Sequence, residues 1–243
     1  SKYRKPQADH AVNASAESLE EFWQIPKSIE NTFIGNLALE LAEVHEFPEF
    51  SMLMILLASA SVSVGCAYAT TYDATEPDST INVGLYVIVE QPPGTGKSRA
   101  LNFLTNPYHE QMTLHNVKVA AKNREISERH IEIPVMKPSF VRATAPTTAS
   151  VDGKMARMAE GRFAIISAEQ STFDSLFPQK GAFSTTNELL LCGYQGEFAD
   201  SSRASRESFC GIAYGAVVVV AQGGSFRRVL AESGGSGLAE RFM

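Results

Sequence analysis

The sequence predicts an α/β protein with a mostly parallel sheet flanked by helices and preceded by an N-terminal helical region. Two observations support this class. Apolar side chains recur at helical spacing in the first third of the chain, as at Phe33, Leu37 and Leu41. After Ile81, apolar runs of strand length alternate with helical segments, which is typical of parallel strands buried on both faces.

The first 80 residues are predicted to be helical, apart from a polar, flexible segment at 1–16. Residues 17–80 are expected to pack on the core domain as helices 17–23, 33–44 and 48–72, followed by an acidic, turn-rich connector at 73–80. The apolar stretch 50–69 is long enough to span a bilayer. Small residues in its second half favour a buried core helix, so we expect no membrane insertion.

Residues 81–243 are predicted to form the core domain. Its strands are expected at 82–90, 140–144, 162–167 and 213–222. Its helices are expected from Lys97 to about His130 with an interruption at Pro107, and at 147–160, 185–192, 225–231 and 237–243. Residues 173–177 are expected to form a short helix or a turn. The polar, basic stretch 196–209 is predicted to be a loop or an exposed hairpin.

Composition excludes several classes of protein. With 243 residues, 44% hydrophobic and 20% charged, the chain is neither disordered, collagen-like nor a coiled coil. Three widely spaced cysteines without a CxxC pair, and no apolar signal core, favour a cytoplasmic protein. The net charge of −6 means that any contact with nucleic acid would use local basic patches. We expect both ends to be cuts from a longer protein.

The segment with recognisable chemistry follows the first predicted strand and reads QPPGTGKS, residues 91–98. Gly94 and Gly96 allow backbone amides to turn around a phosphate, and the helix that follows points its positive end at the same anion. Lys97 is expected to reach the β- and γ-phosphates of ATP, and the Ser98 hydroxyl to bind Mg²⁺. Gln91 replaces the first glycine of the usual GxxxxGK[ST] pattern. The predicted ATP-binding residues are Pro93, Gly94, Thr95, Gly96, Lys97, Ser98 and Arg99.

Two further candidates follow later strands. Glu169 comes after the strand 162–167, where a carboxylate can orient or deprotonate water and contribute to Mg²⁺ binding. Ala168 stands where an Asp is usual, so the metal is expected to bind through water on Ser167 or Glu169. Gln222, at the tip of the last strand, is predicted to contact the γ-phosphate or the attacking water.

Four segments carry a family resemblance: PPGTGKS, IISAEQSTFDSLF, GYQGEFADSSRASR and VVVVAQGGSFRRVLAESGGSGLAERFM. Over residues 48–243 they resemble the YfjI-like P-loop ATPases, a domain-of-unknown-function family of prophages, plasmids and mobile elements, often associated with primases. The resemblance implies a RecA/AAA+-like P-loop NTPase fold and a ring, a hexamer being favoured. It also maps the acidic strand end onto Glu169, the glutamine onto Gln222, and an arginine onto Arg241. We expect an arginine from a neighbouring subunit to complete the site in the ring, with Arg241 as the candidate and Arg203 and Arg206 as rivals for this role.

The leading hypothesis is an ATP-hydrolysing motor, a helicase or translocase acting on single-stranded or forked DNA, with a primase as a possible partner. One alternative is a nucleotide-controlled switch or assembly ATPase that acts on proteins in defence or packaging. Another is a nucleotide-binding module without turnover that only builds an oligomer. Stimulation of hydrolysis by DNA separates the first from both others, and turnover separates the second from the third.

Overall fold

The computed structural model describes residues 24–65, 70–71, 75, 80–129, 141–143, 148–157, 161–177, 187–200, 208–232 and 237–243. The chain divides into two compact units, residues 1–53 and 54–243. The predictions for 1–16 and 17–23, and the two rival arginines Arg203 and Arg206, lie outside the described residues.

The first unit contains α2 (Lys27–Glu30), α3 (Phe33–His45) and the first residues of α4 (Glu49–Gly65). The predicted helix at 33–44 is confirmed. It begins where the Thr32 side chain accepts a hydrogen bond from the Gly35 amide at 3.1 Å, a standard N-terminal cap. It ends at Glu46, whose left-handed backbone stops the helix.

Helix α4 confirms the predicted apolar helix but ends at Gly65, earlier than the expected Tyr72. Thr70–Thr71 forms a short strand, β1, that pairs antiparallel with β2 (Thr80–Ile81). The β-branched threonines favour this extended backbone over a further helical turn. Within the described residues, no single helix is long and apolar enough to cross a bilayer, although α3 and α4 together meet the length and composition criteria across a bend of 117°.

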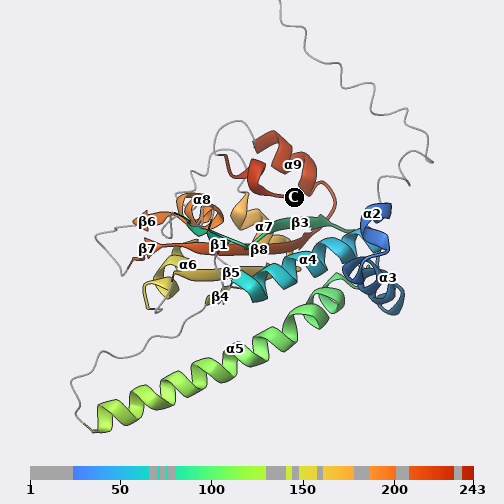
Figure 1. Cartoon of the computed structure of the whole chain (residues 1–243). Helices are drawn as coiled ribbons and strands as arrows, with labels where there is room; N and C mark the ends of the chain where they lie inside the picture. Colours follow the sequence, from blue (N-terminus) through green and yellow to red (C-terminus); the bar gives the residue numbers. More distant parts are fainter. Residues whose placement is uncertain are drawn as a thin grey trace, which may run out of the picture. The chain divides into compact units, whose positions relative to one another are not determined.

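The second unit is built on a four-stranded parallel sheet, in the order β3-β8-β5-β4 (Figure 1). Its strands are β3 (Tyr86–Glu90), β4 (Val141–Ala143), β5 (Arg162–Ser167) and β8 (Tyr214–Ala221). The predicted α/β class with a parallel sheet flanked by helices is confirmed. β3 is shorter than the predicted 82–90, because Asn82 turns its side chain onto the Gly84 amide, Gly193 O and Gly215 O.

Helices cover both faces of this sheet. They are α5 (Lys97–Glu128), α6 (Thr148–Met155), α7 (Gln170–Leu176), α8 (Asn187–Gln195), α9 (Ser225–Glu232) and the short 3₁₀ helix η2 (Ala239–Arg241). Figure 1 shows α7, α8 and α9 on one side of the sheet and α5 on the other. The first group packs in a single apolar cluster with alternate strand residues such as Ile88, Phe163 and Val217.

The structure corrects two further predictions about helices and decides a third, which left open a loop or a hairpin. Pro107 does not interrupt α5, which runs through it as one helix. The helix expected at 237–243 is reduced to η2, because Gly237 takes a left-handed conformation and only three residues follow helically. The stretch 196–209 contributes β6 (Phe198–Asp200), which pairs antiparallel with β7 (Cys210–Ile212).

Candidate functional site

The strand order brings three of the predicted segments to one edge of the sheet. Glu90 is in register with Ala221, and Ser167 with Val219, so β3, β8 and β5 end at nearly the same level. The Gln91 amide continues this pairing with a hydrogen bond of 3.0 Å to the Ala221 carbonyl. With strands about 5 Å apart, the loop after β3 and the residues after β5 begin about 10 Å from each other across β8.

The loop at 91–96 has the geometry of an anion cradle. Gly94 and Gly96 have φ values of 83° and 72°, a left-handed backbone that favours glycine. The Thr95 hydroxyl donates to the Pro92 carbonyl at 2.9 Å and closes the turn. Gly96 precedes α5 without a side-chain cap, so the first-turn amides of a 32-residue helix face the loop without an intrahelical acceptor.

Lys97 is the residue that most directly indicates a ligand. Its side chain is only 8% exposed, and its Nζ atom is buried without a hydrogen-bond partner among the described residues. A buried ammonium without a partner is costly, because it has lost water and gained no counter-charge. Ser98 and Arg99, on the same helical turn, are exposed. The chemistry of the cradle and its lysine is therefore compatible with a phosphate.

Glu169 follows β5 at the same sheet edge and is exposed. It occupies the N-cap position of α7, but its side chain makes no capping hydrogen bond. Ser167, the other residue proposed to bind the metal, is buried, and its Oγ accepts hydrogen bonds from the Glu169 amide at 3.1 Å and the Thr172 hydroxyl at 2.8 Å. Of the two, the Glu169 carboxylate is the one placed to meet a ligand.

Gln222 follows β8, between the loop and Glu169 in strand order, and is exposed. Its backbone amide donates to Gln170 Oε1 at 2.8 Å, and its backbone carbonyl accepts from the Ser225 hydroxyl at 2.7 Å. The structure thus brings Lys97, Glu169 and Gln222 to the same edge of the sheet.

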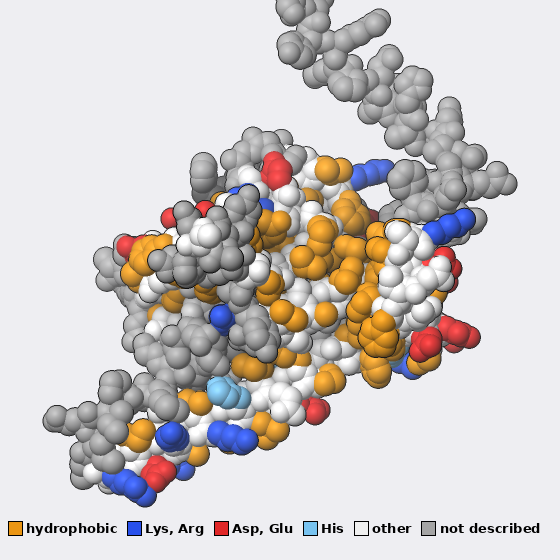
Figure 2. All heavy atoms as spheres, in the orientation of Figure 1, with side chains coloured by type: hydrophobic (Ala, Val, Ile, Leu, Met, Phe, Trp, Pro, Cys, Tyr) orange, Lys and Arg blue, Asp and Glu red, His pale blue; other side chains and the backbone are white. Residues whose placement is uncertain are grey.

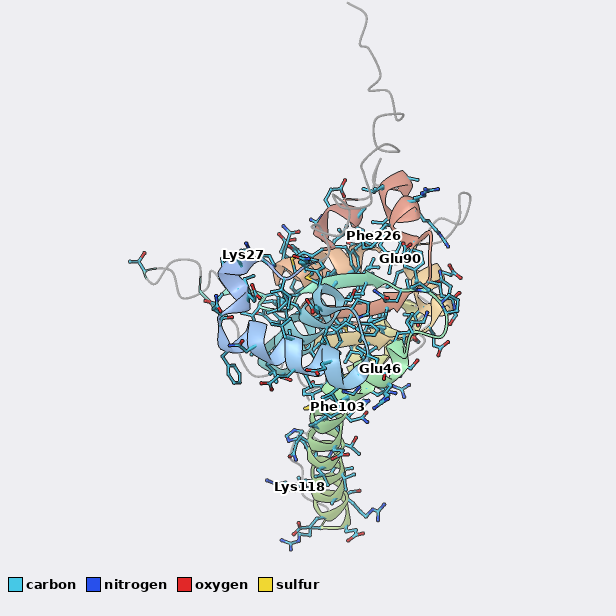
Figure 3. All side chains as sticks on the ribbon, turned by 90° about the vertical axis from the view of Figure 1, so that its right-hand side faces the viewer. Lys27, Glu46, Glu90, Phe103, Lys118 and Phe226 are labelled. Atoms are coloured by element: carbon cyan, nitrogen blue, oxygen red, sulfur yellow. The ribbon has the colours of Figure 1, made fainter. Side chains whose placement is uncertain are left out.

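Sequence reasoning missed Glu90, the last residue of β3. Its two carboxylate oxygens accept hydrogen bonds from the Gly224 amide at 2.8 Å and the Phe226 amide at 2.9 Å, at the start of α9. Figure 3 shows the labelled Glu90 close to Phe226. The sequence contained two features that bear on this contact. An acid ends one strand, and a Gly-Gly-Ser segment lies between another strand and the helix that follows it. Only the pairing of β3 with β8 connects the two.

Arg241 lies elsewhere in the unit. Its guanidinium donates to Gly237 O and to Gln195 Oε1, the latter at 2.9 Å, and lies 5.7 Å from the Tyr194 ring centre. Tyr194 in turn packs against Tyr86, the first residue of β3. Burial raises the pKa of the Tyr86 hydroxyl well above its usual value, and the Arg241 charge partly opposes this rise. Arg241 is therefore near the amino end of the strand whose carboxyl end carries the loop, about 13 Å away along the strand.

Among the described residues, no group of three or more His, Cys, Asp or Glu side chains is arranged to hold a metal ion. Ser98 and Glu169, the two residues that the sequence predicts as Mg²⁺ ligands, are both exposed, and each carries an oxygen atom of the kind that Mg²⁺ prefers. In comparisons with known proteins, no family model, no curated protein and no solved structure matches this chain.

Proposed function

We propose that the chain binds ATP at the edge formed by β3, β8 and β5, and that it hydrolyses the nucleotide. One observation carries this proposal: within the part of the chain that the structure describes, the buried Lys97 ammonium has no hydrogen-bond partner, and it lies beside a glycine cradle at the start of a long helix. A triphosphate would supply the missing negative charge to the lysine, the loop amides and the helix terminus together.

The roles follow from the positions of the residues. The loop amides and Lys97 hold the phosphates and stabilise charge on the γ-phosphoryl group. Glu169 positions the attacking water and accepts its proton as the new P–O bond forms and ADP leaves, while the Gln222 amide contacts the γ-phosphate or that water. Ser98 and Glu169 are the proposed ligands of Mg²⁺, which supplies neutralisation of phosphate charge.

We further propose that the unit has a RecA/AAA+-like P-loop NTPase fold and works as a homo-oligomeric ring, a hexamer, on single-stranded or forked DNA, with a primase as partner. The resemblance to YfjI-like ATPases supports this. A second support is local: although the chain is acidic, the second half of α5 carries the exposed residues Lys118, Lys122 and Arg124, and the exposed Arg129 follows its last residue. Figure 2 shows blue side chains along this helix. Such a patch can contact phosphates despite the net charge.

A second candidate is a nucleotide-controlled switch that acts on proteins. Ala168 precedes Glu169 where a metal-binding Asp is usual, and the neighbouring Ser167 hydroxyl is held by Thr172. This arrangement offers Mg²⁺ fewer oxygen ligands than a site with the usual Asp would, and it suits slow hydrolysis. ATP turnover measured with and without single-stranded DNA separates the two: a motor is stimulated severalfold, whereas a protein switch is not.

The nucleotide site itself is tested by Lys97→Ala. We expect loss of ATP turnover and ATP binding weakened about 10- to 100-fold, the equivalent of the about 1.5–3 kcal/mol that a hydrogen bond to a charged group contributes. Lys154→Ala, at an exposed lysine of α6, is the matched control and should behave like the wild type. A folded Lys97→Ala protein with unchanged ATP binding and turnover would refute the assignment.

A further inference from the structure

Glu90 joins the phosphate loop to the turn that carries Gln222. It is one residue before Gln91, the first residue of the loop, and its carboxylate bridges to the next strand end by accepting from the Gly224 and Phe226 amides at 2.8 and 2.9 Å. Each oxygen is used by a different amide. The bridge therefore fixes both the position and the orientation of residues 222–226 relative to β3.

The turn needs such support because two glycines form it. Gly224 has φ 92°, a conformation open to glycine, and Gly223 follows Gln222 directly. Glycines lose more conformational freedom on folding than other residues, so a fixed geometry here requires outside contacts. A Cβ built on Gly223 would come within 3.7 Å of Glu90 Oε1, which shows how closely the carboxylate approaches the turn.

Gln222 is held from the opposite side as well. Gln170, which follows Glu169 directly, accepts the Gln222 amide at 2.8 Å, and Ser225 donates to the Gln222 carbonyl at 2.7 Å. These bonds use the Gln222 backbone and not its side-chain amide. The backbone is thus anchored next to the loop by Glu90 and next to the proposed general base by Gln170.

Resting on the proposed function, we infer that Glu90 is a positioning residue: its carboxylate sets the Gln222 side chain against the nucleotide held by the loop. A carboxylate that served only as a cap for α9 would contribute to stability and would leave the chemical step unchanged. The two roles therefore differ in the kinetic constant that a substitution alters.

The test is Glu90→Gln, compared with Glu188→Gln as a matched control. The amide keeps the size of the side chain but places an NH₂ group against one of the two backbone donors. Glu188 lies in the first turn of α8 and is exposed, so its substitution removes the same charge from another helix start. We expect kcat for ATP with Mg²⁺ to fall about 10- to 100-fold in Glu90→Gln, the scale of a misplaced catalytic group. The ATP dissociation constant should stay within about twofold, and Glu188→Gln should retain the wild-type values.

Amide hydrogen exchange without nucleotide provides a second readout. Exchange at Gly224 and Phe226 should become faster in Glu90→Gln and remain unchanged in Glu188→Gln. Unchanged exchange, or a kcat equal to that of the wild type, overturns the inference while leaving the proposed function intact. A parallel loss of ATP affinity and kcat also overturns it, since that result indicates a general structural defect. If the wild type hydrolyses no ATP, the proposed function fails as well.

Discussion

At the scale of single residues, Lys97 differs from the other partly or fully buried cations of the second unit. Arg228 pairs with Asp174 at 2.5 Å, donates to Phe177 O and lies over the Phe173 ring. Arg162 donates to Gly65 O and lies over the Tyr214 ring. Lys97 has no comparable partner among the described residues, yet it is the cation most withdrawn from water. Its burial is explained if an anion completes the site.

A prediction at the residue scale concerns Glu169. Glu169→Gln keeps the shape of the side chain but removes the carboxylate, so ATP binding should survive while turnover falls by ~10²-fold or more, the effect of losing a positioned base. Binding by calorimetry and steady-state turnover check this. Glu197→Gln, an exposed acid between α8 and β6, is a suitable control. Unaffected turnover would exclude Glu169 as the base and would favour Gln222 as the residue that positions the attacking water.

At the scale of elements, α5 is unusual because one helix of 32 residues contains a proline. Buried side chains before Pro107, such as Leu101 and Thr105, and Val119 after it belong to the same continuous helix. A proline inside a helix removes one backbone hydrogen bond and costs up to about 3 kcal/mol relative to alanine. Here the helix continues regardless, with Pro107 on its exposed side.

This continuity can be tested by Pro107→Ala. If α5 is one helix, alanine restores a hydrogen bond and should raise the free energy of unfolding by about 1–3 kcal/mol, with a gain in helical circular dichroism. Urea denaturation measures the first quantity. Gln111→Ala, one turn later at an exposed position, should change stability only slightly. A neutral or destabilising Pro107→Ala would instead indicate that a second helix begins at the proline, where its fixed φ is favourable.

At the scale of the whole molecule, Arg241 does not lie at the proposed site of its own chain. That guanidinium is bonded to Gln195 and Gly237, near the opposite end of β3 from the loop. The sequence-based expectation that Arg241 completes a neighbour's site in a ring remains a prediction. An arginine supplied across an interface is worth on the order of 10³–10⁵ in rate, because its forked, permanent charge suits the phosphoryl transition state.

Subunit mixing tests that prediction. Lys97→Ala protein has a defective loop and an intact arginine, and Arg241→Ala protein has the reverse. If Arg241 acts across an interface, mixtures form some sites with both intact, and ATP turnover returns above that of either variant. A mixture of Lys97→Ala with Glu169→Gln is the negative control. Both residues belong to the same sheet edge of one chain, so no site in this mixture has both intact and turnover should not return. The absence of recovery at any ratio, in oligomers shown to exchange subunits, argues against Arg241.

The elements with strong local patterns were predictable from the sequence alone. The strand 162–167 was predicted with the bounds it has, because a continuous apolar run of strand length reflects burial on both faces. Helical spacing predicted the helix beginning at Phe33 to within one residue, but its buried residues are Gly35, Ala38, Ala42 and His45, while Phe33 is 79% exposed. The turn at 91–96 was also predictable, since the left-handed positions at Gly94 and Gly96 favour glycine. These features depend on residues close together along the chain.

What only the tertiary structure decided depends on residues far apart in sequence. The insertion of β8 between β3 and β5 places Gln222 between the loop and Glu169, and no local pattern specifies strand order. The same insertion creates the Glu90 bridge, which joins residues 134 and 136 positions apart. Arg241 is separated from the loop along β3, because its bonds to Gln195 and Gly237 hold it near the opposite end of that strand. A hydrogen bond between two strand ends produces no periodic pattern in the sequence, because the order of the strands in the sheet determines which residues become its partners.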